Sequence, residues 1–169
     1  IMNNIKEDIL KSSRELFTNY GYKKVSMDEI AKASGVTKKT VYSYFKDKAS
    51  LLKTLIDEKK KKMRKIIISH SNINDENFFE EVNKTLYDLL KYKREAKLFV
   101  TLTKEADELN TISSKNSIEM IDDAILSFIK ERLSWAIEKG YVKKCDPDLC
   151  AFIIYKVYVA VMFEWDKEI

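Results

Sequence analysis

Apolar residues recur every three to four positions along most of the chain, which is the period of amphipathic α-helices. This spacing predicts long helices over about 4–20, 47–69, 75–91, 94–109, 112–139 and 147–165. Only 3 Gly and 1 Pro occur in 169 residues, so the chain has few of the turn residues that a β-sandwich needs. The pattern therefore predicts an all-α fold.

The stretch Val25–Leu52 predicts two short helices, a tight turn between them and the start of the next long helix. Ser26 and Glu29 have the spacing of a capping box at the start of the first short helix. Gly35 stands where a chain leaving a helix favours a left-handed residue. Thr37 then suits the N-cap of the second short helix.

This second short helix, Lys38–Phe45, has one apolar edge and one polar, basic face. Val41 and Phe45 form the edge, and the opposite face suits insertion into a DNA major groove. Other interpretations stay open, because lysine pairs are commonly solvated and tyrosines commonly pack in cores.

The charge is distributed unevenly along the chain. The first 65 residues hold 17 Lys/Arg and 8 Asp/Glu, whereas the remainder holds 14 and 19. A basic N-terminal region on an acidic body indicates a polyanionic partner for that region only.

The unbroken run Leu16–Leu52 resembles the DNA-binding domain of the TetR family of transcriptional regulators. The matching features are Leu16-Phe17, Gly21-Tyr22, Ser26, Ile30-Ala31, Gly35-Val36, Thr37, Val41-Tyr42, Tyr44-Phe45, Lys48 and Leu51-Leu52. The resemblance implies a TetR-like fold, with a helix-turn-helix DNA-binding domain over 1–47 and a helical regulatory and dimerisation domain over 48–169.

The resemblance also implies that Tyr42 and Lys48 bind DNA phosphates and that the helix start at Ser26 contacts another. Side chains at the start of the recognition helix are expected to face phosphates or base edges. The expected DNA-binding residues are Ser26, Thr37, Lys38, Lys39, Thr40, Tyr42, Tyr44 and Lys48.

The last predicted helix is apolar on all sides, and Lys156 is the only charged residue between Leu149 and Phe163. Such a helix is expected to be buried on more than one side, and this run is shorter than the roughly 20 residues of a membrane span. The resemblance implies that two C-terminal helices pair with those of a second copy. The sequence ends at Ile169, so the second of these helices is expected to be missing from it.

TetR-like bodies enclose a small-molecule pocket, and the body of this chain offers aromatic or large apolar side chains to line one. Plain core packing is the alternative role for each candidate, and the few charged residues available indicate a mostly apolar ligand. The candidates are Tyr87, Phe99, Leu102, Phe128, Trp135, Tyr155 and Tyr158.

Other functional classes find little support in the sequence. No nucleophile–base pair, carboxylate dyad, metal-ligand cluster or phosphate-binding Gly loop is recognisable, so neither an enzyme nor a metal or cofactor is expected. Cys145 and Cys150 lack metal-ligand spacing, and no signal peptide or membrane span is recognisable, which favours a cytoplasmic location. The residue bias toward Lys, Ile, Asn and Tyr favours a low-GC bacterial source.

The resemblance to the TetR family thus implies a transcriptional regulator, expected to be a repressor, that binds double-stranded DNA at a palindromic operator as a homodimer and is released by a small, mostly apolar ligand. The alternative is a helix-turn-helix adaptor that binds protein without an effector. The basic N-terminal region argues against an adaptor, because the core of a protein interface is depleted of lysine.

Overall fold

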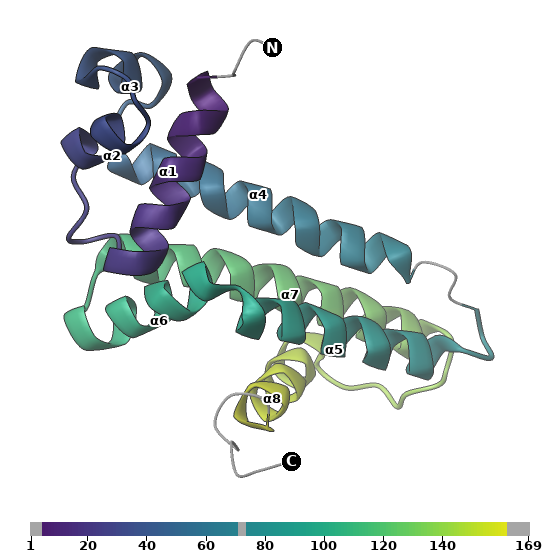
Figure 1. The fold of residues 1–169 in the computed structure, drawn as a ribbon. Coiled ribbons are helices and arrows are strands. Elements are labelled where there is room, and N and C mark those ends of the chain that lie inside the picture. Colours follow the sequence, from purple (N-terminus) through teal and green to yellow (C-terminus); the bar gives the residue numbers. More distant parts are fainter. Residues whose placement is uncertain (1–4, 71–73, 162–169) are drawn as a thin grey trace. The chain divides into compact units, whose positions relative to one another are not determined.

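The computed structural model describes residues 5–70 and 74–161 of the chain. Within these residues the chain forms eight helices and no strand, which confirms the all-α prediction (Figure 1). The helices are α1 (Ile5–Tyr20), α2 (Met27–Ala33), α3 (Lys38–Tyr44), α4 (Lys48–Ser69), α5 (Phe78–Glu95), α6 (Lys97–Leu109), α7 (Ile112–Glu138) and α8 (Pro147–Val159).

The chain divides into two compact units, and α4 and α7 each contribute to both. Unit 1 contains Ile1–Lys60 and Ala96–Glu119, and unit 2 contains Lys61–Glu95 and Met120–Ile169. This division follows the packing of the helices. The boundary after residue 47 is a division by function and stays a prediction.

In unit 1, buried apolar side chains come from α1, α2, α3, α6 and the part of α4 up to Lys60. Phe17 and Ile30 are fully buried, and the ring of Phe17 meets the edge of Tyr22 with 5.4 Å between ring centroids. Ile5 and Tyr20 of α1 are 39% and 63% exposed. They lie at the two ends of the helix, where its neighbours no longer cover them.

The start of α5 differs from the sequence prediction by three residues, because side chains cap the backbone in another way. The Asn74 backbone N–H donates to Asn77 Oδ1 at 2.7 Å, and the Asn77 N–H donates to Asn74 Oδ1 at 3.0 Å. This reciprocal turn delays the helix to Phe78, whereas the sequence predicts a start at residue 75.

In unit 2, a polar cluster lies inside the apolar core that α5, α7 and α8 form. The Lys93 ammonium lies 2.5 Å from Asp122 Oδ1 and donates to the Tyr155 hydroxyl at 3.0 Å. Lys93 is 9% exposed and Tyr155 3% exposed. Burial, and next the charge of Asp122, raise the pKa of the Tyr155 phenol above its ordinary value. The cluster links three helices that are distant in the sequence.

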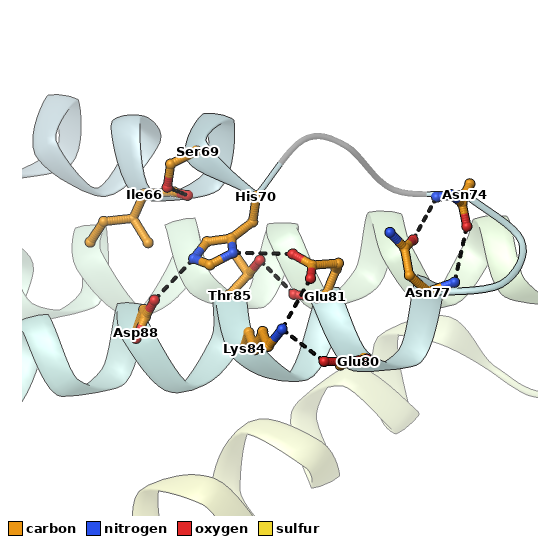
Figure 2. Close-up of polar contacts among 10 residues, drawn as sticks. All are labelled: Ile66, Ser69, His70, Asn74, Asn77, Glu80, Glu81, Lys84, Thr85 and Asp88. Carbon is orange, nitrogen blue, oxygen red and sulfur yellow. Dashed lines mark hydrogen bonds and ion pairs between the residues drawn. The ribbon is translucent and has the colours of Figure 1, made fainter.

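The end of α4 is joined to α5 by His70, the single histidine of the chain (Figure 2). Its Nδ1 lies 3.2 Å from Glu81 Oε2, and its Nε2 lies 3.0 Å from Asp88 Oδ2. Because the two carboxylates approach opposite ring nitrogens, they cannot share one metal ion with this imidazole. His70 is therefore a bridge between helices.

The last described helix, α8, begins at Pro147 as the sequence predicts, and Asp146 is its N-cap. Its Ala151 and Tyr155 are buried against unit 2, but its opposite face is exposed and apolar. That face comprises Leu149, Phe152, Ile153 and Val157, each between 50% and 56% exposed. The predicted continuation to residue 165 runs beyond the described residues. No described helix is both long and apolar enough to cross a membrane.

Candidate nucleic-acid interface

The start of α2 has the predicted capping box. The Glu29 N–H donates to Ser26 Oγ at 3.2 Å, and the Ser26 N–H donates to Glu29 Oε2 at 2.7 Å. This backbone hydrogen bond, above all, holds the pKa of Glu29 below its ordinary value. Both Ser26 donors serve Glu29, since the hydroxyl also reaches Oε2 at 2.8 Å. A phosphate at this position must therefore replace that carboxylate.

The turn between α2 and α3 depends on Gly35, whose φ is +69°. A Cβ added there would meet no heavy atom within 4 Å, so the constraint comes from the backbone and not from crowding. Thr37 then caps α3, and its Oγ1 accepts from the Thr40 N–H at 3.2 Å. The helix-turn-helix predicted from the sequence is present.

The two faces of α3 differ as predicted. Val41 is fully buried and Phe45, which follows the helix, is 4% exposed. On the outer side, Tyr42 and Tyr44 are each 45% exposed, and Lys39 is exposed beside them. Short polar side chains and phenol groups therefore stand at the surface of a helix that is anchored by its apolar edge.

Lys38, which opens α3, is not free. Its ammonium lies 2.9 Å from Asp28 Oδ1 of α2, and the hydrogen bond to Asp28 raises the pKa of Lys38. Both side chains are exposed, so this ion pair can exchange with solvent or with a phosphate.

Lys48, at the start of α4, is directed toward the protein's own backbone. Its ammonium donates to the carbonyl oxygens of Tyr22 and Val25, each at 2.7 Å, and to that of Lys23 at 3.4 Å. It also lies 4.4 Å from the centroid of the Tyr22 ring. Burial lowers the pKa of Lys48, while the nearby carboxylates of Glu105 and Glu29 oppose that shift. The three carbonyls use all three ammonium donors.

The same segment is held from its other side by Glu105 of α6, a residue that the sequence does not single out as part of a DNA-binding region. The Tyr22 and Lys23 backbone N–H groups donate to its Oε2 and Oε1, each at 2.6 Å. Glu105 is 5% exposed. The only sequence signal is an acidic residue on the apolar stripe of its helix.

Comparison with known proteins agrees with this geometry. The family model described as "Bacterial regulatory proteins, tetR family" matches residues 9–55. A Bacillus subtilis (strain 168) protein named as the uncharacterized HTH-type transcriptional regulator YhgD is 33% identical over 167 residues, covering 96% of this chain and 85% of its own length. The chain belongs to the TetR family of transcriptional regulators.

Solved structures of other proteins share the fold. The fatty acid degradation regulator FadR from Bacillus halodurans is 25% identical with a TM-score of 0.74, covering 94% of this chain and 86% of its own. The regulator AibR, solved with isovaleryl coenzyme A and operator DNA, is 21% identical with a TM-score of 0.65, covering 98% and 91% of the two chains. The shared fold therefore extends beyond the N-terminal match.

The candidate ligand residues of this TetR-family chain lie in different surroundings. Phe99 and Leu102 are buried in unit 1, and Phe128 and Tyr155 are buried in unit 2. Trp135 stacks on Phe78 with 4.5 Å between ring centroids. The remaining two are Tyr87, which is 48% exposed, and Tyr158, whose hydroxyl donates to Asn83 Oδ1.

An apolar cavity of about 200 Å³ lies in unit 2, lined by residues of α5, α7 and α8 and by Val142. Of the seven candidates, Tyr158 is among its lining residues. Most of the remaining lining residues were not predicted from the sequence, because they belong to apolar helix stripes that resemble an ordinary core. The other lining residues are Phe78, Phe79, Val82, Asn83, Leu86, Ile129, Arg132, Leu133, Ala136, Val142 and Ile154.

Proposed function

We propose that this TetR-family regulator is a repressor that binds a palindromic operator as a homodimer and is released by a small, mostly apolar ligand. The outer face of α3 supports the first part most directly. Its exposed tyrosines and Lys39 stand on a helix whose Val41 edge is fixed in the core. Helix-turn-helix proteins place such a helix in the DNA major groove.

The DNA contacts proposed for this face are of two kinds. Thr37, Lys38, Lys39, Thr40, Tyr42 and Tyr44 form the direct set. Ser26 is proposed to contact a phosphate only where a DNA oxygen replaces Glu29. Lys48 is proposed to contact one by giving up its 3.4 Å bond to Lys23 while it keeps those to Tyr22 and Val25. Phosphate contacts supply most of the affinity and make it dependent on salt.

The exposed apolar face of α8 supports the homodimer. A row of large apolar side chains that are about half exposed is unusual on a monomer and favours a protein partner. A second copy fits, because a two-fold dimer pairs the same face with itself and brings two α3 helices to one operator.

The unit 2 cavity supports the ligand. Its wall is apolar apart from Asn83, Arg132 and Tyr158, a mixture typical of sites that hold an apolar body and orient it by a few polar groups. The solved FadR and AibR structures support an acyl-type ligand for this chain.

Selection of bound sequences from a random pool of DNA duplexes tests the DNA-binding part. The expected product is a palindrome that binds one dimer by mobility shift. Addition of free fatty acids of different chain length, whose acyl chains suit an apolar cavity of about 200 Å³, is expected to release it. Selection that enriches no sequence would contradict the proposed function, whereas enrichment without release would contradict the ligand part alone.

A further inference from the structure

Unit 1 buries a carboxylate, that of Glu105, whose hydrogen-bond partners are backbone amides. Glu105 is 5% exposed, and within the described part of the chain no Lys or Arg nitrogen forms an ion pair with it. A carboxylate is costly to bury unless hydrogen bonds satisfy its oxygens. Here both oxygens accept short bonds from backbone amides of the connection between α1 and α2.

The opposite side of that connection is held by a cation. Lys48 donates to the carbonyl oxygens of Tyr22, Lys23 and Val25, while Glu105 accepts from the N–H groups of Tyr22 and Lys23. The peptide units of one short segment are thus fixed by opposite charges from α4 and α6. The segment leads directly into Ser26, the N-cap of α2.

Gly21, the residue before this segment, leaves room for the Glu105 carboxylate. Gly21 has φ +83°, and a Cβ built on it would lie 3.0 Å from Glu105 Oε2. A side chain at this position would push the carboxylate away from the Tyr22 amide that it accepts from at 2.6 Å. The close approach of α6 therefore depends on a residue without a side chain.

We propose that Glu105 is a positioning residue for DNA binding, which sets the orientation of α2 and α3 by fixing the segment Tyr22–Val25 together with Lys48. The inference rests on the proposed use of the outer face of α3 to contact DNA.

The chain offers matched controls for a test by substitution. Thr101 lies one turn before Glu105 on α6, and its Oγ1 donates to the Thr18 carbonyl of α1 at 2.9 Å. Thr101→Val removes a contact between α6 and α1 but leaves the Tyr22–Val25 segment untouched. Glu108→Gln makes the same charge change as Glu105→Gln on an exposed residue of α6.

Affinity for the selected duplex is measured at a temperature where each variant is folded by circular dichroism. Glu105→Gln keeps the shape but lacks one acceptor oxygen, and Glu105→Asp keeps the charge but falls short by one methylene. Both are expected to lose tenfold or more in affinity for the selected duplex and less for a random duplex, while both controls stay within about twofold. Wild-type affinity and selectivity in folded Glu105→Gln and Glu105→Asp would overturn the proposal.

A double-mutant cycle adds a measurement that a purely stabilising role would not change. Glu105 and Lys48 hydrogen-bond to the same segment from opposite sides. The losses in DNA affinity caused by Glu105→Gln and Lys48→Met should therefore be far from additive. Additive losses would mean that the two residues act separately, which contradicts a shared positioning role.

Amide NMR spectra separate this inference from the proposed function, because they require no DNA. With Glu105→Gln, the amide signals of α2 and α3 are expected to shift along with those of Tyr22 and Lys23. Shifts confined to Tyr22 and Lys23 would overturn the positioning role even if the wild-type protein bound no duplex.

Discussion

Asp28 of α2 and Lys38 of α3 form an exposed ion pair across the turn of the helix-turn-helix, with 2.9 Å between Oδ1 and Nζ. The pair places a negative charge beside the lysine that begins the proposed recognition helix. Exposed ion pairs contribute little to stability, so its principal effect is expected on the electrostatics of DNA binding.

Asp28→Asn is therefore expected to strengthen DNA binding several-fold, since it removes a carboxylate that competes with phosphate for Lys38. The gain should be largest at low salt and should be seen on every sequence. Mobility-shift titrations at two salt concentrations measure it. Asp57→Asn, which breaks the exposed Lys53–Asp57 pair of α4, provides the matched control. An equal gain in both variants would show that only net charge matters.

Two glycines with positive φ predict different costs of substitution. Gly35→Ala is expected to destabilise by about 1–2 kcal/mol, because only the left-handed backbone is strained there. Gly21→Ala should cost more, since its Cβ also meets Glu105 Oε2. Urea unfolding of the two variants gives the comparison. If Gly35→Ala proved the more destabilising, the proposed clash between a Cβ at position 21 and Glu105 would be refuted.

The buried pair of unit 2 predicts an asymmetry between single and double substitution. Lys93→Met leaves Asp122 without its cation, and the expected loss in the free energy of unfolding is about 2–3 kcal/mol. This is at or below the lower end for buried ion pairs, because the Asp122 side chain is 29% exposed. Lys93→Met with Asp122→Leu should recover most of this loss. Thermal unfolding measures both. A double variant less stable than either single variant would contradict this account.

The His70 bridge predicts how stability depends on acid. The hydrogen bond to His70, followed by that to Lys84, lowers the pKa of Glu81 from its ordinary 4.5. A carboxyl group with a lowered pKa in the folded state contributes stability that is present above pH 4.5 and is lost as the pH falls through the lower value.

His70→Gln removes the main cause of that shift, so acid unfolding should begin at a higher pH than in the wild-type protein. Fluorescence-monitored unfolding between about pH 2 and pH 6 measures the midpoint. Glu76→Gln, which changes an exposed acidic residue, serves as the comparison. An unchanged midpoint in His70→Gln would show that the bridge contributes nothing to the folded state.

Local sequence patterns predict much of this fold. The capping box at Ser26, the left-handed turn at Gly35 and the Asp146-Pro147 start of α8 all depend on residues within one helical turn, and all three are found. The division of α3 into an apolar edge and an outer face follows from helical spacing in the same way.

Long-range pairings were not accessible to the same reasoning. Glu105 lies 83 residues from Tyr22, and Lys93 lies 62 residues from Tyr155, so no local pattern connects them. Lys48 shows the consequence. Its sequence position indicates a phosphate contact, yet in the folded chain its donors serve backbone carbonyls. Lining residues of the unit 2 cavity were hidden because a cavity wall and a packed core use the same apolar side chains.

The outer face of α3 is proposed to bind duplex phosphates. The decisive measurement is the salt dependence of affinity for the selected duplex, in the wild-type protein and in Lys39→Gln. Lys144→Gln is the control, an exposed lysine outside the helix-turn-helix. The account predicts that Lys39→Gln binds every duplex more weakly and that the slope of log affinity against log salt falls by about 1, with no change for Lys144→Gln. Wild-type slope and affinity in Lys39→Gln would contradict it.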